Sequence, residues 1–134
     1  MRLRVRFAET DQMGIAHHSA YVVWLEAGRV EWLRERGLSY RQLEDEGVSL
    51  AVSGVEVGYR TAARFDDEIE VETTLVEARS RRFRFSYRLT RTEDSALLAT
   101  GSTVHVPTDR RGRAMRLPEE WLDRLLGLVG GERK

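Results

Sequence analysis

The residues best suited to chemistry lie between positions 9 and 18. An acidic turn that contains Asp11 is followed by Gly14 and by the pair His17-His18. An apolar segment comes next and predicts a helix, whose first amides and partial positive charge would lie beside the turn. A thioester carbonyl placed there would be polarised, and the carboxylate could attack it or activate water. The pattern favours a role for Asp11 in acyl-group chemistry.

Each of these residues also has a simpler interpretation. Asp11 and Thr10 could only shape a turn, because such side chains often bond to their own backbone. His17 and His18 are adjacent, and only His105 could join them as a third histidine, so we expect no metal site. One of the pair could orient substrate or move a proton. The sequence has no serine nucleophile elbow and no phosphate-binding glycine loop.

Arginines gather at two predicted turns. Arg79, Arg81 and Arg82 form one cluster, and residues 110–113 contain the other. Arginines at loop ends can bind phosphates, although such runs are often only solvated turns. Lysine plus arginine equals aspartate plus glutamate, 22 each, and no aromatic residues are interleaved with the clusters. A nucleotide-bearing cofactor such as coenzyme A therefore fits better than a nucleic acid.

Composition narrows the class of protein. The 134 residues suit one domain spanning 1–134, with 41% apolar residues in periodic runs and 33% charged residues. The absence of cysteine excludes disulfides, thiolate zinc sites and a cysteine nucleophile. No segment is long and apolar enough for a membrane span, and we find no signal peptide, so we expect a cytoplasmic protein.

The first third of the chain predicts a strand and a long helix. Apolar residues alternate with arginines over residues 2–7, which is typical of a strand, and a loop follows over residues 8–16. Ser19 is the expected cap of a helix over residues 20–37. Its first half is apolar on every side and is therefore expected to be buried all round. Tyr21 is close enough to the helix start to touch a ligand.

The remainder predicts mainly strands. A short helix capped by Ser39 leads into a meander of four strands, and Pro118 occupies the first position of a C-terminal helix. Residues 130–134 are expected to fray. One long helix on a five-stranded antiparallel sheet is an α+β design, and its uncovered edges favour self-association. The expected strands of the meander are 48–59, 68–77, 82–92 and 97–106.

Residues 9–21, followed by Trp24-Leu25-Glu26 and Arg29, resemble the signature of hot-dog-fold acyl-CoA thioesterases. The nearest branch is the 4-hydroxybenzoyl-CoA thioesterase-like group, which includes the Tol-Pal-associated thioesterases. The resemblance covers nearly the whole chain, because Asp66-Asp67 matches the family's acidic turn before its third strand and residues 110–118 resemble its late turn, which leads to an Arg-Leu-Pro segment. The family commonly has aspartate where this chain has Glu9.

The resemblance implies a role for each candidate residue. Asp11 falls on the family's catalytic aspartate, as nucleophile or general base, and the backbone N–H at His18 would polarise the carbonyl. His17 stands where the family often has an aromatic residue. His17 and Tyr21 are the expected substrate-binding residues. The basic turn that contacts coenzyme A phosphates matches Arg79, Arg81 and Arg82.

The resemblance also implies an assembly and leaves alternatives open. A hot-dog domain would form a homodimer with a continuous sheet, or a homotetramer, and would need no cofactor, since coenzyme A is part of the substrate. A module that binds acyl-CoA or acyl-carrier protein without cleavage is the alternative function. A dehydratase is disfavoured because its histidine motif is not found. His18 favours aliphatic or mixed acyl groups over strictly aromatic ones.

Overall fold

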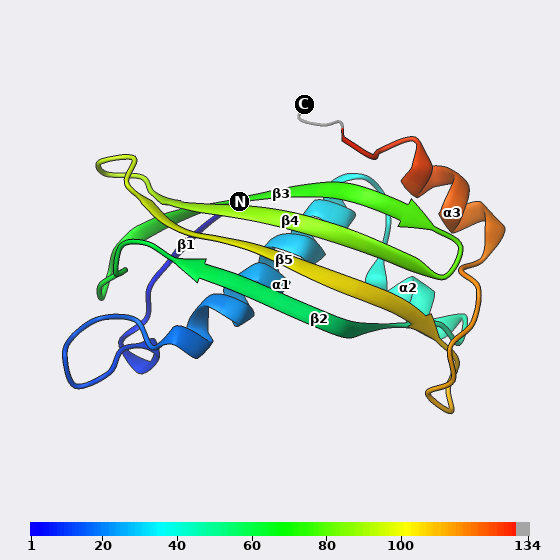
Figure 1. The fold of residues 1–134 in the computed structure, drawn as a ribbon, viewed down its shortest axis with the longest axis horizontal. Helices are drawn as coiled ribbons and strands as arrows, with labels where there is room; N and C mark the ends of the chain where they lie inside the picture. The colour runs from blue at the N-terminus through cyan, green and yellow to red at the C-terminus, as the bar shows by residue number, and fades with distance from the viewer. Residues whose placement is uncertain (131–134) are drawn as a thin grey trace. The chain divides into compact units, whose positions relative to one another are not determined.

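The computed structural model describes residues 1–130, and the residues expected to fray lie mostly outside that range, at 131–134. One long helix and a five-stranded sheet confirm the predicted α+β class (Figure 1). None of the helices within residues 1–130 is long and apolar enough to cross a membrane. The elements in chain order are β1 (Arg2–Arg4), the 3-10 helix η1 (Phe7–Glu9), α1 (His18–Glu35), α2 (Tyr40–Asp45), β2 (Ser49–Tyr59), β3 (Glu68–Arg79), β4 (Arg82–Arg91), β5 (Leu97–Thr108) and α3 (Glu119–Leu126).

The order of the strands in the sheet is β1-β3-β4-β5-β2, so the predicted four-strand meander is wrong in one respect. Strands β3, β4 and β5 are consecutive neighbours, but β2 lies beside β5 at one edge. Strand β1 takes the other edge and runs antiparallel to β3, with Leu3 opposite Ile69. Because β3 already has β4 on one side and β1 on the other, the free place for β2 is beside β5.

The chain forms two compact units, each made of several segments. The first comprises Met1–Trp32, Glu56–Thr73 and Tyr87–Gly101. The second comprises Leu33–Val55, Thr74–Ser86 and the described part of Ser102–Lys134. Each unit contains its own buried side chains, and each is described by itself below.

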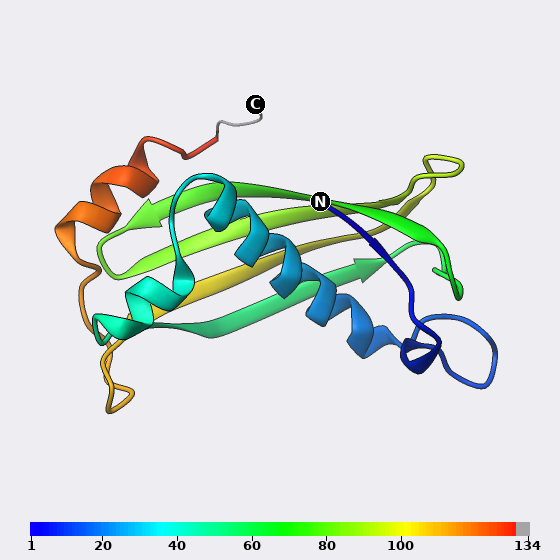
Figure 2. The same cartoon turned by 180° about the vertical axis from the view of Figure 1, so that it is seen from behind.

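In the first unit, one side of α1 packs on the strands (Figure 2). Tyr21, Trp24 and Leu25 are almost fully buried. The expectation that this half of the helix is buried all round is wrong, because Val22 and Val23 are 40% and 53% exposed. The helical repeat turns these two valines away from the sheet, which covers one side of the helix.

The observed ends of β1 and α1 differ from the predicted ones. The predicted strand over residues 2–7 is too long, since β1 ends at Arg4 and Phe7 starts the 3-10 helix with 77% of its surface exposed. Helix α1 begins at His18, so Ser19 lies inside it. The predicted end near Gly37 is close to the observed one, where the Leu38 amide donates to the Leu33 carbonyl at 2.9 Å.

In the second unit, the predicted short helix is confirmed, and the C-terminal helix begins one residue later than predicted. The Ser39 hydroxyl caps α2 by accepting the Gln42 amide at 3.1 Å. Pro118 precedes α3 at the capping position instead of occupying its first turn, because its ψ of 141° is not helical. Trp121 and Leu125 of α3 are buried. The core of this unit also contains Leu43, Leu75, Phe83, Phe85, His105 and Leu117.

The 3-10 helix before the catalytic candidates is anchored by Glu9. Its carboxylate accepts the Arg6 amide at 2.8 Å, the Arg6 guanidinium at 3.2 Å and the indole N–H of Trp24 at 3.1 Å. Burial disfavours the ionised carboxylate, but these hydrogen bonds outweigh burial and lower the pKa of Glu9. An ionised Glu9 therefore ties the start of the site loop to the buried side of α1.

Gly28 marks the closest approach of α1 to the sheet. A Cβ at this position would lie 2.6 Å from Val71 Cγ1 and 3.0 Å from Thr73 Oγ1. We expect Gly28→Ala to destabilise the fold by about 1–2 kcal/mol, since the cost of overpacking exceeds the gain in helix propensity. Urea unfolding measures the change. Gly127→Ala is the matched control, because a Cβ there meets nothing nearer than 3.6 Å. A Gly28→Ala protein as stable as the wild type would contradict this packing.

The anchoring by Glu9 predicts a dependence on pH. Because the folded state lowers the pKa of Glu9, its contribution to stability is complete above the ordinary value of 4.5 and is lost as the pH falls through the folded-state pKa. We expect Glu9→Gln to be roughly 1–2 kcal/mol less stable than wild type at pH 7, and the difference to narrow in acid. Urea unfolding between pH 3 and pH 7 tests this, with the exposed Glu26→Gln as a charge control. A difference that stays constant with pH would refute it.

Candidate active site

The loop between η1 and α1 is a closed hairpin. Thr10 and Ala16 form an antiparallel bridge, and the His17 amide donates to the Glu9 carbonyl at 2.7 Å. The Asp11 amide donates to the Ile15 carbonyl at 2.9 Å. These bonds bring the two ends of the loop together, so the segment that carries Asp11 has a fixed stem.

Asp11 lies at the turn of this hairpin with its side chain exposed. Its Oδ1 accepts the Met13 amide at 2.8 Å, and its carbonyl accepts the Gly14 amide at 3.0 Å. Gly14 has a φ of +79°, which glycine adopts without the steric cost that other residues bear. The turn-forming role predicted as the alternative is therefore present, and the same bond fixes the direction of the carboxylate.

His17, and not Ser19, caps the start of α1. Its Nδ1 accepts the Ser19 amide at 3.2 Å and lies 2.8 Å from the Ser19 hydroxyl. Its carbonyl accepts the Ala20 amide at 3.0 Å. The rings of His17 and His18 lie together, with centroids 4.1 Å apart.

None of these capping bonds uses the backbone N–H of His18. Within residues 1–130, no hydrogen bond uses it. It is the first N–H of an 18-residue helix, at the end where the helix dipole is positive. The His18 side chain is exposed, so a carbonyl oxygen can approach from solvent. The arrangement matches the requirement for polarising a carbonyl.

Two tyrosines support the first turn of α1. The Tyr59 hydroxyl, at the end of β2, donates to the His18 carbonyl at 3.0 Å. Its ring stands edge-on to that of Tyr21, with centroids 4.9 Å apart. The Tyr21 hydroxyl oxygen accepts the Ala63 amide at 3.2 Å, and burial raises the pKa of this hydroxyl. Tyr21 thus lies beneath the site, whereas Tyr59 is 48% exposed beside it.

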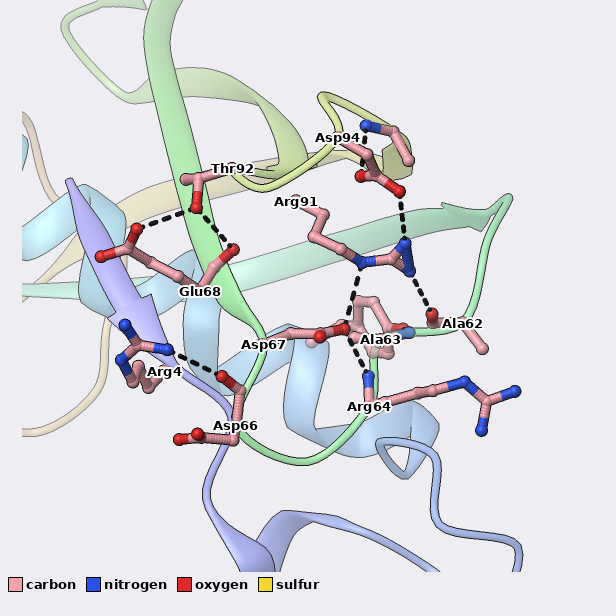
Figure 3. Close-up of polar contacts among 12 residues, drawn as sticks. Arg4, Ala62, Ala63, Arg64, Asp66, Asp67, Glu68, Arg91, Thr92 and Asp94 are labelled. Atoms are coloured by element: carbon pink, nitrogen blue, oxygen red, sulfur yellow. Dashed lines mark hydrogen bonds and ion pairs between the residues drawn. The ribbon is translucent and has the colours of Figure 1, made fainter.

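A second loop, residues 60–67, packs against the site hairpin. The Ala16 amide donates to the Ala63 carbonyl at 2.8 Å, and Ile15 forms a bridge with Arg64. Figure 3 shows how this second loop is held by charged side chains around Asp67 and Arg91. The hairpin with Asp11 is therefore supported from a segment about fifty residues further along the chain.

The predicted phosphate-binding arginines lie in the second unit, at the turn between β3 and β4. Glu77 forms ion pairs with Arg79 at 2.8 Å and with Arg82 at 3.2 Å. Arg81 lies at the tip of the turn and is exposed. The carboxylate reduces the positive charge of the cluster, so Arg81 is the residue best placed to meet an anion.

His105 belongs to the second unit, whereas His17 and His18 belong to the first. His105 is fully buried in the second unit, where its Nε2 lies 2.8 Å from the Thr103 hydroxyl and its ring stacks on Phe83. Across the described residues 1–130, no group of three or more histidine, cysteine, aspartate or glutamate side chains could hold a metal ion.

Sequence reasoning missed the residues that hold the site. The sequence marks Glu9 only as part of the acidic turn and as a departure from a family pattern, and it does not mark Tyr59 or Arg91. No local pattern marks Tyr59 or Arg91, since their partners are 41 and 24 positions away. The acidic character of the turn at Asp66-Asp67 was visible, but not the arginine that faces it.

Comparison with known proteins places this geometry in a family. The model of the Thioesterase-like superfamily matches residues 5–125. The acyl-CoA thioester hydrolase YbgC of Escherichia coli O6:H1 is 33% identical over 95 residues, which are 71% of each chain.

Two solved structures resemble the fold closely. The hypothetical protein TT1821 from Thermus thermophilus has a TM-score of 0.90 and 44% identity, covering 96% of this chain and 97% of that one. A DHNA-CoA thioesterase from Staphylococcus aureus has a TM-score of 0.91 and 25% identity, covering 95% and 87% respectively. The family model matches nearly the whole length of this chain. The chain therefore has the hot-dog fold and belongs to the Thioesterase-like superfamily, a family of thioester-hydrolysing enzymes.

Proposed function

We propose that this protein hydrolyses acyl-CoA thioesters to a free acid and coenzyme A. The observation that carries the proposal is the unused His18 amide at the start of α1, which directly follows the closed hairpin that carries the exposed Asp11 carboxylate. A donor for the developing oxyanion and a carboxylate for the attack are the two groups that acyl transfer needs. The relatives named for thioester hydrolysis support the same reaction class.

The overall reaction consumes one water molecule and leaves the protein unchanged. If Asp11 acts as a general base, it takes a proton from water as the water oxygen attacks the carbonyl carbon, and the His18 amide holds the oxyanion. The intermediate then releases the thiolate of coenzyme A, which takes the proton from Asp11. If Asp11 acts as the nucleophile, its carboxylate oxygen attacks the carbonyl carbon, the C–S bond breaks, and the thiolate of coenzyme A leaves a mixed anhydride behind. Water then cleaves the anhydride to the free acid and the Asp11 carboxylate, and the thiolate takes up the proton that this step releases. Both routes use the same two groups.

The remaining assignments belong to the same proposal. His17 and Tyr21 contribute to the acyl side of the site, and Arg79, Arg81 and Arg82 bind the phosphates of coenzyme A. The motif of residues 9–21 supports the Tol-Pal-associated branch of the family, acting as one hot-dog domain without a cofactor. The apolar side chains exposed on β2, namely Val52, Val55 and Tyr59, support a dimer or tetramer joined at that edge of the sheet.

Asp11→Asn is the first test, because the amide oxygen of asparagine can still accept the Met13 N–H and keep the turn. We expect turnover to fall roughly 100-fold or more, since the base or nucleophile is gone. Free thiol release is followed with short-chain, long-chain and aromatic acyl-CoA substrates, which also gives the acyl preference. Asp109→Asn is the matched control, since Asp109 accepts two amides in another turn.

The outcomes of this test separate the two functions under consideration. Wild-type turnover in the Asp11→Asn protein would overturn the proposed mechanism. A wild-type protein that binds acyl-CoA without releasing thiol from any substrate would favour the binding module instead.

The arginine cluster gives a second test. We expect Arg81→Ala to raise KM for acyl-CoA about tenfold with little change in kcat, because a charge-assisted bond to phosphate acts away from the reacting carbonyl. The same variant should behave as wild type with a pantetheine thioester that lacks the nucleotide. Arg41→Ala, at an exposed position on α2, controls for the loss of a surface charge. An equal effect on both substrates would exclude phosphate binding at this turn.

A further inference from the structure

The loop between β2 and β3 contacts the site at Ala63 and Arg64, and two arginines outside the site, Arg4 and Arg91, bind it. We propose that Arg91 is a positioning residue for catalysis, which fixes loop 60–67 and, through it, the Asp11 hairpin and the first turn of α1. The inference rests on the proposed function, since it says how the catalytic groups of that site are held in place.

Arg91 distributes its guanidinium over three different acceptors (Figure 3). Nε donates to Asp67 Oδ2 at 3.2 Å, Nη2 donates to the Ala62 carbonyl at 3.0 Å, and Nη1 donates to Asp94 Oδ2 at 3.2 Å. The side chains of Arg91 and Asp67 are only 14% and 17% exposed, whereas Asp94 is 54% exposed. The two bonds to the loop are therefore shielded from water, and the bond to Asp94 contributes little.

Asp67 passes this restraint to the backbone of the loop. The oxygen that receives the Arg91 guanidinium, Oδ2, also accepts the Arg64 amide at 2.8 Å. The Asp67 amide donates back to the Arg64 carbonyl at 3.1 Å. Arg91 thus holds the loop at Ala62 directly and at Arg64 through the carboxylate.

The residues between and beside these two points contact the site. The Ala63 carbonyl accepts the Ala16 amide at 2.8 Å, which fixes the end of the Asp11 hairpin. The Ala63 amide donates to the Tyr21 hydroxyl at 3.2 Å, which fixes the first turn of α1. Ile15, whose carbonyl accepts the Asp11 amide, forms a bridge with Arg64. Both catalytic groups are therefore connected to Ala63 and its neighbours.

Displacement of the loop would separate the two catalytic groups. A shift of about 1 Å in the position of a reacting group can reduce the rate roughly 100-fold. Lysine cannot replace Arg91, because one ammonium on a flexible stem does not reproduce a planar fork that reaches the Asp67 carboxylate and the Ala62 carbonyl at once. The geometry, and not only the charge, is what the loop requires.

Steady-state kinetics of four variants test the inference. We expect Arg91→Lys and Arg91→Gln to lower kcat by about 10- to 100-fold with little change in KM, at a temperature where both are fully folded. Asp94→Asn should stay near wild type, since it removes only the exposed arm. Arg124→Gln is the matched control, because Arg124 donates to the carbonyls of Arg36 and Gly37 in the second unit.

Hydrogen exchange distinguishes positioning from general stability. In Arg91→Gln, the amides of Ala16 and Ala63 should exchange faster than in the wild type. The Leu117 amide, which donates to the Ser80 carbonyl in the second unit, should keep its wild-type rate. A merely structural role for Arg91 would accelerate all three amides together, in line with the loss of global stability.

The outcomes separate failure of this inference from failure of the proposed function. If the wild-type protein releases no thiol from any acyl-CoA, the function is wrong, and the exchange rates at Ala16 and Ala63 still report whether Arg91 holds the loop. If the wild type is active and Arg91→Lys retains its full kcat, the positioning role is wrong. Equal losses of kcat in Arg91→Gln and Arg124→Gln would likewise overturn it.

Discussion

The hydrogen bond from the Ala16 amide to the Ala63 carbonyl joins the two loops on which the site depends. On one side of it lies the hairpin that carries Asp11, and on the other lies the connection between β2 and β3. Neither loop has regular secondary structure of its own to hold it in place. A charged side chain therefore holds each loop in place. Glu9 holds the start of the hairpin, and Arg91 holds the connection between β2 and β3.

Both anchors are charged groups removed from most of the solvent, and both hold backbone atoms. Glu9 accepts an amide and an indole N–H, and Arg91 donates to a carbonyl and a carboxylate. Charged hydrogen bonds of this kind are stronger than neutral ones and have narrower geometry. The Asp11 carboxylate, the proposed base or nucleophile, is itself exposed. The proposed reactive groups are thus exposed to water, whereas the charged side chains that hold their loops in place are mostly buried.

Much of the fold could be predicted from the sequence because it depends on local patterns. Alternation of apolar residues located β3, β4 and β5 to within two residues, and the Ser39 cap located α2. The place of β2 beside β5 could not be predicted, because strand order depends on which sheet edges remain free. Phe7 was assigned to a strand since its alternation continues from Val5, but the bonds of Glu9 bend the chain into a 3-10 helix there.

The candidate site was predicted in part for the same reason. Asp11 and the start of the helix are close in sequence, so their spacing was informative. The capping role of His17 was not predicted, since serine is the commoner capping residue and Ser19 was at hand. The roles of Tyr59 and Arg91 depend on partners distant in sequence, which no local pattern encodes. The resemblance to a family indicates the proposed reacting residues, whereas the residues that support them are visible only in the structure.

The strand order also has a consequence for the way the chain folds. Strand β1 pairs with β3, so Arg2 meets Glu70 across a separation of 68 positions, and the Tyr21 hydroxyl meets the Ala63 amide across 42. Contacts between such distant residues require large loops to close, which slows folding. The three consecutive strands β3, β4 and β5 can pair early, because their partners are neighbours along the chain, whereas the site loops form only after the long-range pairings. Activity should therefore appear only in the last stage of folding, after most of the secondary structure has formed.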